Sequence, residues 1–239
     1  MSDERFVLDQ PASNDIHQQH LARYRFAGSF VQGKRVIDVA CGTGYGSAML
    51  ADLGAAHVVG VDVSAESIEG ASRTWRRQNV EFQHRDALTI DQLEPVDVAV
   101  SFETIEHLER PEEFLQAVRR VLLPGGQFLV STPERRKGSI HEKPDNPFHL
   151  REWSRGEFVD LLERYFGTVT IHGQYAMAKQ AYPLSMTLQR LIAGVLHPEA
   201  KDALYSFPVL ESSPPVGGFR MMCIYMVAVC QHPLPKGST

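Results

Sequence analysis

The stretch that decides the fold is Val36-Ile-Asp-Val-Ala-Cys-Gly-Thr-Gly-Tyr-Gly46. It begins with β-branched residues, which are typical of a buried strand, and continues into a glycine-rich turn before a run of small residues. A strand, a glycine-rich turn and a helix in this order form the start of a βαβ unit, whose turn lies at the carboxyl end of the strand. The stretch therefore predicts an α/β protein with a ligand against this turn.

Short apolar runs alternate with amphipathic stretches on the carboxyl side of the turn. Ser64 and the capping box Ser154-Arg-Gly-Glu157 mark two helix starts, and Pro111 marks a third. Further strands are expected at 57–62, 80–85, 96–101, 127–131, 168–172 and 221–229. This alternation predicts a doubly wound, mostly parallel sheet that is covered by helices on both faces.

The length of 239 residues fits one domain, and we expect a single domain over 1–239. Residues 1–33 are expected to form a helical cover, and residues 34–172 the cofactor-binding core. Residues 174–218 are expected to form an insertion on the substrate side, and residues 219–231 are expected to form the last strand. Long loops in a compact domain are usually lids or binding loops, so the insertion is expected to choose the acceptor.

The composition indicates which kinds of binding partner and which cellular compartment to expect. Lys and Arg total 24 against 29 Asp and Glu, a net charge of −5, which weighs against nucleic acid or an anionic membrane as the main partner. The longest nearly apolar run, 221–230, is too short to span a bilayer. The polar segment Met1–Phe6 does not resemble a secretory signal. Cys41, Cys223 and Cys230 lack metal-ligand spacing, so we expect a cytoplasmic protein.

The glycine-rich turn also predicts the class of cofactor. Asp62 ends the second strand, twenty residues after Gly42, where a carboxylate can accept hydrogen bonds from both ribose hydroxyls of an adenosine. The dinucleotide fingerprint would require a glycine at Ser47, whereas the third glycine here is Gly46. A carboxylate at Asp38 would repel a pyrophosphate but suits a cofactor that carries an ammonium and a sulfonium.

The string Asp38-x-Ala-Cys-Gly-Thr-Gly-Tyr-Gly46 resembles the first motif of class I S-adenosylmethionine-dependent methyltransferases. Further motifs in the family's order extend the resemblance over about residues 34–172. It implies a Rossmann-like methyltransferase fold of seven strands with the last one antiparallel, an N-terminal helix and a lid-like insertion. The implied cofactor is S-adenosylmethionine, with S-adenosylhomocysteine as product. The implied cofactor-binding residues are Asp38, Ala40, Gly42, Thr43, Gly44, Tyr45, Asp62, Val63, Asp86, Ala87, Phe102 and Glu103.

Two histidines are candidate catalytic residues. His107 follows the fourth strand, and the histidine of a similar Glu-His pair serves as a base in several small-molecule methyltransferases. It could instead shape the cofactor pocket through a hydrogen bond. His149, in a later polar loop, could touch the acceptor, orient His107 or close the loop. The segment His20-Leu-Ala-Arg23-Tyr24 resembles a segment that covers the cofactor in this group, so Arg23 could pair with the cofactor carboxylate.

The same segment allows a metal site. Glu103, Glu106 and His107 stand at i, i+3 and i+4, so a helical turn would place them on one face. With His149 as a fourth ligand they could hold Mg²⁺ or Mn²⁺. The pattern resembles that of small-RNA 3′-terminal 2′-O-methyltransferases and also occurs in ubiquinone-pathway O-methyltransferases. The sequence leaves a divalent metal open as an alternative.

The expected function is methyl transfer from S-adenosylmethionine to a hydroxyl oxygen of a small molecule or saccharide. One alternative is a metal-dependent RNA 2′-O-methyltransferase. A second is a nicotinamide-dependent oxidoreductase or epimerase, and a third is a module that binds the cofactor without chemistry.

Overall fold

The computed structural model describes residues 15–135, 144, 146–177, 209–211 and 221–235. The α-helices are α1 (Asp15–Val31), α2 (Tyr45–Asp52), α3 (Ala65–Thr74), α4 (Pro111–Val121) and α5 (Arg155–Glu163). Two 3₁₀ turns are η1 (Ala87–Gln92) and η2 (Ile105–His107). The strands are β1 (Arg35–Val39), β2 (His57–Asp62), β3 (Val80–His84), β4 (Val96–Phe102), β5 (Leu122–Pro133), β6 (Phe166–Met177), β7 (Val209–Leu210) and β8 (Met221–Pro233).

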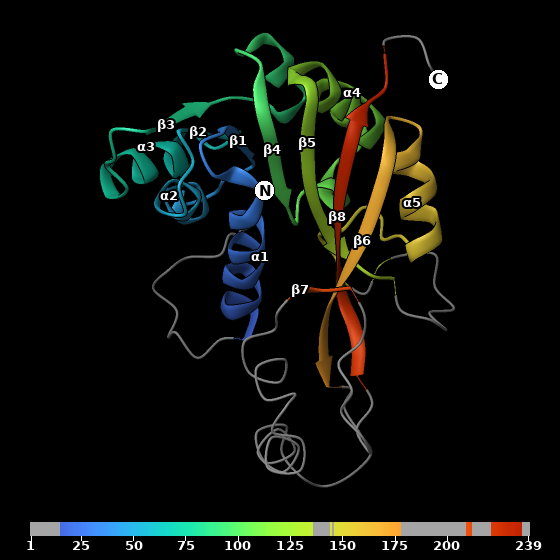
Figure 1. The fold of residues 1–239 in the computed structure, drawn as a ribbon. Helices are drawn as coiled ribbons and strands as arrows, with labels where there is room; N and C mark the ends of the chain where they lie inside the picture. Colours follow the sequence, from blue (N-terminus) through green and yellow to red (C-terminus); the bar gives the residue numbers. More distant parts are fainter. Residues whose placement is uncertain (1–14, 136–143, 145, 178–208, 212–220, 236–239) are drawn as a thin grey trace, which may run out of the picture.

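The strands form one sheet in the order β3-β2-β1-β4-β5-β8-β6-β7 (Figure 1). Strands β1 to β5 are parallel, and β8 lies antiparallel between β5 and β6. The predicted α/β fold, with a mostly parallel sheet and an antiparallel last strand, is confirmed. The order reverses between β1 and β4, which is where the crevice of such a sheet forms.

Within the described residues the sheet has eight strands, one more than the seven that the resemblance implied. The extra strand, β7, has two residues and pairs with Gly173 and Gln174 of β6, so it is too short to leave a periodic signal in the sequence. Strand β6 also continues to Met177, so residues 174–177 belong to the sheet and not to the expected insertion. Apart from 209–211, the rest of that insertion lies outside the described residues, as do residues 1–14 of the expected N-terminal cover.

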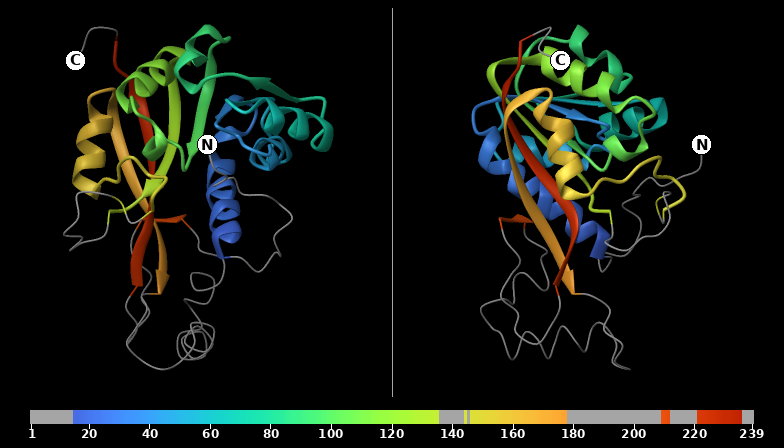
Figure 2. Two further views of the ribbon diagram at one scale, coloured as in Figure 1. Left: turned by 180° about the vertical axis from the view of Figure 1, so that it is seen from behind. Right: turned by 90° about the vertical axis from the view of Figure 1, so that its right-hand side faces the viewer.

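Helices cover both faces of the sheet (Figure 2). On one face α1 and α2 pack on the strands through buried apolar side chains that include Ala27, Leu50 and Val98. On the other face α4 and α5 pack through a second core that includes Phe114 and Phe158. The predicted helix starts are confirmed: Ser64 caps α3, Pro111 begins α4, and Ser154 and Glu157 form the capping box of α5. Within the described residues, no helix is long and apolar enough to cross a membrane.

Because β1 to β5 are parallel, their carboxyl ends meet at one edge of the sheet, which faces α1 in Figure 1. The glycine-rich turn after β1, Asp62 at the end of β2 and η2 after β4 all lie at this edge. The fold therefore brings the sequence-predicted candidates to one side of the molecule.

Candidate functional site

The glycine-rich turn adopts the left-handed backbone that its composition predicts. Gly42 has a φ of 54° and Gly44 a φ of 81°, and Gly44 is the N-cap of α2. A Cβ at Gly44 would lie 2.6 Å from the Cβ of Ala71, so the turn also packs closely against α3. Trp75 Nε1 donates a hydrogen bond to the carbonyl of Thr43 at 2.9 Å. This hydrogen bond to the turn was not predicted, because a half-buried tryptophan just beyond the end of a helix belongs to no recognisable motif.

Asp62 braces the same turn from the end of β2. Its Oδ2 accepts a hydrogen bond from the backbone N–H of Gly42 at 2.9 Å, and its Oδ1 accepts one from the N–H of Ser64 at 2.8 Å. The carboxylate is only partly buried, and its neighbour Val63 is 67% exposed. A partly open carboxylate beside an exposed apolar side chain is suited to a ribose and an adenine face.

Asp38 lies beneath the turn and not on its surface. Its carboxylate accepts hydrogen bonds from Ser47 Oγ at 2.7 Å and from the hydroxyl of Tyr24 at 3.1 Å. Burial raises the pKa of Asp38 to about 7, although both hydrogen bonds act in the opposite direction. Tyr24 comes from α1, and its ring occupies the space that a Cβ at Gly46 would need. The third glycine is therefore explained by the packing of α1 on α2.

Arg23 of α1 is fully buried beside the turn. Its Nη1 donates a hydrogen bond to Gln174 Oε1 at 2.7 Å, and its guanidinium lies 4.4 Å above the ring of Tyr225. Its Nη2 is 4.0 Å from Glu103 Oε1, at the limit of an ion pair. Within the described structure, Nε and Nη2 have no hydrogen-bond partner. Buried donors without partners are costly, so a guanidinium in this state is suited to receive an anionic ligand group.

The segment after β4 departs from the helical turn that the sequence predicts. Glu103 has a φ of 55°, and helical structure begins only at Ile105, as the 3₁₀ turn η2. The left-handed backbone turns Glu103 toward β5, where its Oε1 accepts a hydrogen bond from Ser131 Oγ at 2.6 Å. Burial raises the pKa of Glu103, and the nearby Arg23 opposes that change. Glu103 and Glu106 therefore do not share a helical face.

His107 and His149 lie together, as one of the sequence-based alternatives for His149 requires. Their ring centroids are 5.0 Å apart, with the ring planes at 79°. His107 Nδ1 lies 2.9 Å from the carbonyl of Phe148, which can only accept a hydrogen bond. A neutral His107 therefore carries its proton on Nδ1 and its lone pair on Nε2.

The loop that carries His149 is held closed over η2. The carbonyl of Glu106 accepts a hydrogen bond from the N–H of Leu150 at 2.9 Å. His149 Nδ1 lies 2.7 Å from Glu152 Oε1, and its Nε2 lies 2.9 Å from Asn146 Nδ2. Asn146 Oδ1 accepts from the N–H of Phe148, so its Nδ2 faces His149 as a donor. These contacts fix both the ring and the loop.

Three of the four candidate metal ligands converge. One ligand atom from each of Glu106, His107 and His149 lies within 4.8 Å of the other two, and Glu103 is outside this group. Glu106 is fully buried, and in the part of the chain that the structure describes neither carboxylate oxygen has a hydrogen-bond partner. Burial and the neighbouring Glu103 raise its pKa well above the usual range. A cation there would compensate this carboxylate, so Glu106 and His107 fit a divalent metal. His149 could join them only by releasing the contact between its Nε2 and Asn146.

The remaining candidate cofactor residues lie at the carboxyl ends of β1, β3 and β4. Asp86 is exposed, and its Oδ1 accepts a hydrogen bond from the N–H of Leu88 as the N-cap of η1, with Ala87 beside it. Phe102 is buried and packs on Tyr24 with ring centroids 5.1 Å apart. Tyr45 begins α2, and its ring centroid lies 5.7 Å from that of Tyr24. Ala40 precedes the turn with a φ of 59°.

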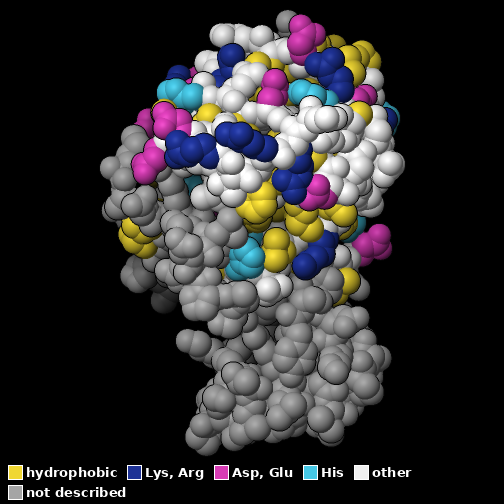
Figure 3. Space-filling model, turned by 90° about the vertical axis from the view of Figure 1, so that its left-hand side faces the viewer, with side chains coloured by type: hydrophobic (Ala, Val, Ile, Leu, Met, Phe, Trp, Pro, Cys, Tyr) yellow, Lys and Arg dark blue, Asp and Glu magenta, His cyan; other side chains and the backbone are white. Residues whose placement is uncertain are grey.

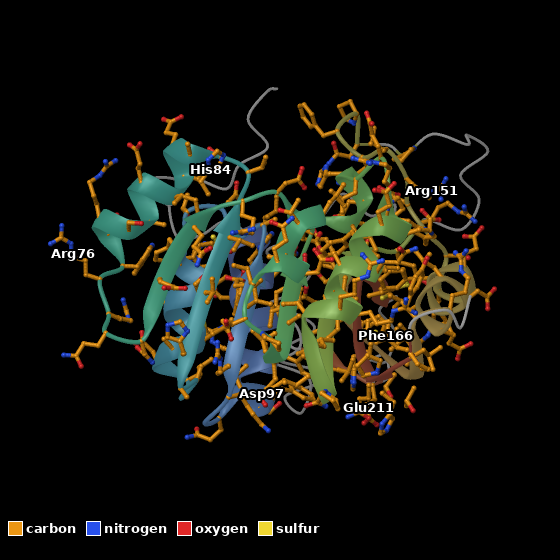
Figure 4. All side chains as sticks on the ribbon, turned by 90° about the horizontal axis from the view of Figure 1, so that it is seen from above. Arg76, His84, Asp97, Arg151, Phe166 and Glu211 are labelled. Carbon is orange, nitrogen blue, oxygen red and sulfur yellow. The ribbon has the colours of Figure 1, made fainter. Side chains whose placement is uncertain are left out.

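Several basic side chains on the described surface lie beside acidic ones. On the face in Figure 3, Lys and Arg side chains lie next to acidic ones. Arg77 pairs with Asp52 at 2.8 Å, and Arg73 lies 3.7 Å from Glu69. Arg76 and Arg151 lie on opposite sides of the molecule (Figure 4).

Comparisons with known proteins show the family of this chain. The family described as "Methyltransferase domain" matches residues 30–180. A Mycolicibacterium smegmatis protein named "Probable S-adenosylmethionine-dependent methyltransferase" is 34% identical over 164 residues, which cover 68% of this chain and 63% of that protein. The chain thus spans less than two thirds of that relative. A "Ubiquinone biosynthesis O-methyltransferase" from Caulobacter sp. strain K31 is 36% identical over 181 residues, covering 68% of this chain and 71% of the relative.

A solved structure shares the fold at low sequence identity. It is the N-methyltransferase NodS from Bradyrhizobium japonicum in complex with S-adenosyl-L-homocysteine. The two chains have a TM-score of 0.58 and 15% identity, and the match covers 93% of this chain and 90% of that one.

Proposed function

This chain belongs to the class I S-adenosylmethionine-dependent methyltransferases, and from that premise we propose that it transfers a methyl group to a hydroxyl oxygen of a small-molecule or saccharide acceptor. Two thirds of the chain align with a relative named for ubiquinone-pathway O-methylation, which favours oxygen as the acceptor atom. The family assignment displaces the nicotinamide-dependent alternative. The predicted cofactor is S-adenosylmethionine.

The observation that carries the proposal is the arrangement of Asp62 at the glycine-rich turn. The carboxylate already holds the N–H groups of Gly42 and Ser64, so it is fixed in orientation while part of it remains open. Such a carboxylate can accept both ribose hydroxyls without reorganising. Exposed Val63 would lie against the adenine, and Arg23 would pair its unpartnered guanidinium nitrogens with the carboxylate of the methionine part.

The cofactor supplies an electrophilic methyl group, so the protein must align the acceptor, exclude water and take up a proton. As the new C–O bond forms and the C–S bond breaks, the acceptor oxygen gives up its proton. We assign this proton to His107 Nε2, because Nδ1 faces the Phe148 carbonyl and leaves the lone pair on Nε2. His149 and its loop hold the His107 ring in place. Alignment of the reactants is worth up to about 7–11 kcal/mol in such reactions.

The test is transfer of a labelled methyl group from S-adenosylmethionine to a panel of quinols, phenols and saccharides. His107→Gln should lower kcat by about a hundredfold or more while leaving the affinity for S-adenosylhomocysteine within about threefold. His57→Gln, a half-buried histidine at the amino end of β2, is the matched control and should keep the wild-type rate. A wild-type rate for His107→Gln would remove its assignment as the base.

A second candidate feature is a divalent cation held by Glu106, His107 and His149. The buried, unpartnered carboxylate of Glu106 beside two imidazoles favours it. A cation would stabilise the ionised form of Glu106 and would acidify an acceptor hydroxyl. Methyl transfer that is abolished by EDTA and restored by Mg²⁺ or Mn²⁺ would support the cation, whereas full activity in EDTA would leave His107 as the sole proton acceptor. The RNA 2′-O-methyltransferase alternative needs the same cation, and labelled methyl transfer to RNA, assayed beside that panel, would favour it.

A further inference from the structure

Arg23 is held by a pair of residues that neither the motif nor the family assignment singles out. Gln174 of β6 and Tyr225 of β8 are direct partners in the antiparallel register, so their side chains lie on the same face of the sheet. Gln174 accepts a hydrogen bond from Arg23 Nη1 at 2.7 Å, and the ring of Tyr225 lies 4.4 Å below the guanidinium. The two contacts fix the guanidinium from one edge and from one face.

Gln174 also links Arg23 to the backbone of its own helix. The side chain is fully buried, and its Nε2 donates a hydrogen bond to the carbonyl of Gln19 at 3.0 Å. One amide therefore accepts from the side chain of α1 and donates to its backbone. Only a neutral amide of this length can accept from Arg23 and donate to Gln19 at the same time. A carboxylate would repel the Gln19 carbonyl, and an apolar side chain would leave Arg23 Nη1 and that carbonyl without this hydrogen-bond partner.

On its other side Arg23 makes no hydrogen bond within the described residues. Nη1 is used by Gln174, whereas Nε and Nη2 have no hydrogen-bond partner within the described residues. Glu103, at 4.0 Å from Nη2, is the nearby acid but is already bonded to Ser131. The guanidinium is thus fixed, while two of its buried nitrogens make no hydrogen bond within the described residues.

We propose that Gln174 is a positioning residue for the cofactor: together with Tyr225 it aims Arg23 at the cofactor's α-carboxylate, and so makes binding depend on an intact amino-acid part. This inference rests on the proposed function and adds the group that orients Arg23. It also gives a role to the buried polar contacts that join α1 to β6 beside its apolar packing, since the same amide holds the Gln19 carbonyl and the Arg23 side chain.

The test compares two probes by calorimetry, S-adenosylhomocysteine and 5′-methylthioadenosine, which keeps the adenosine and the thioether but lacks the amino-acid part. Gln174→Met should weaken binding of S-adenosylhomocysteine by about tenfold and leave that of methylthioadenosine unchanged. Gln174→Glu should also weaken only S-adenosylhomocysteine, because an internal carboxylate would occupy Arg23. If Gln174→Met does not fold, Gln174→Glu alone is used for the test. Gln127→Met, in β5 opposite Gln231, is the matched control and should change neither affinity.

Each outcome decides the inference. Equal losses for both probes would show a general effect of loosening α1 and would overturn the positioning role, as would wild-type affinities for both. If the wild type binds S-adenosylhomocysteine more tightly than methylthioadenosine and the Gln174 variants keep the same affinity ratio, the positioning role of Gln174 is overturned. The proposed function would not be affected by that result. A wild-type protein that does not bind S-adenosylhomocysteine would overturn the proposed function together with it.

Discussion

Replacing Asp38 by Asn should remove a pH dependence of folding that one buried carboxyl group imposes. The side chain is 1% exposed, and burial together with the charge of Asp62 raises its pKa from 3.8 to about 7, against the hydrogen bonds from Ser47 and Tyr24. In the folded protein the group keeps its proton up to about pH 7, whereas in the unfolded chain it loses the proton near pH 4.

The sign and the size of the effect follow from this difference. Because the folded state binds the proton more tightly, the contribution to stability is fully present below the unfolded pKa. It is lost as the pH rises toward the folded pKa. The slope between the two values is about 1.4 kcal/mol per pH unit, so the free energy of unfolding should fall by roughly 4 kcal/mol across the whole interval. Above about pH 7 this group should cause no further fall.

The assay is urea unfolding of the cofactor-free protein at pH 5, 6, 7 and 8, followed by tryptophan fluorescence. Relative to Asp38→Asn, the free energy of unfolding of the wild type should fall by roughly 2–3 kcal/mol between pH 5 and pH 7. From pH 7 to pH 8 the stability curves of the two proteins should run parallel. Asp160→Asn, at an exposed position of α5, controls for the removal of one surface charge. Parallel stability curves for wild type and Asp38→Asn from pH 5 to pH 8 would refute the reasoning.

Three shorter predictions test other contacts. Asp62→Ala removes the acceptor for two backbone N–H groups and for the ribose, so calorimetry should show S-adenosylhomocysteine binding weakened by about a hundredfold or more; unchanged affinity would contradict the assignment. Gly46→Ala places a Cβ 2.0 Å from the Tyr24 ring and should lower the free energy of unfolding by about 1–3 kcal/mol, whereas Gly156→Ala, which meets nothing within 4 Å, should not lower it. Ser154→Ala breaks the capping box of α5 and should cost about 1 kcal/mol in urea unfolding; equal stability would mean that the box is not needed.

The sequence predicts the parts of this fold that depend on local chemistry. Strands appear as β-branched runs and helix starts as caps, so β2 has the bounds expected of it and Ser64 and Ser154 cap their helices. The glycine-rich turn is likewise local, because a left-handed backbone at Gly42 and Gly44 requires the residue type that is present. Such features can be predicted because neighbours in the chain determine them.

What the sequence does not predict depends on contacts between distant residues. The periodicity of Glu103, Glu106 and His107 suggests a shared helical face, but the hydrogen bond to Ser131 holds Glu103 in a left-handed conformation and separates the two acids. Gln174 is 151 residues from Arg23 in the chain, and no pattern in its neighbourhood distinguishes it from other strand residues. Tertiary geometry determines these positions, so only the structure reveals them.

Two buried ionisable groups at the carboxyl edge of the sheet define the site most sharply. Arg23 has unpartnered donors, and Glu106 has an unpartnered carboxylate, in the portion of the chain that is described. Each would be costly if it served stability alone, because a buried polar group without a partner loses its hydration and gains nothing in return. If they were partners they would neutralise each other, but Arg23 is instead held by Gln174 and Glu106 lies beside His107 and His149. The Arg23 guanidinium is a cation and the ionised Glu106 carboxylate is an anion, so they require different ligand groups. Arg23 requires an anion beside the glycine-rich turn, and Glu106 requires a proton or a cation beside the histidines. A carboxylate-bearing cofactor and an acceptor hydroxyl that must give up its proton supply this pair of groups.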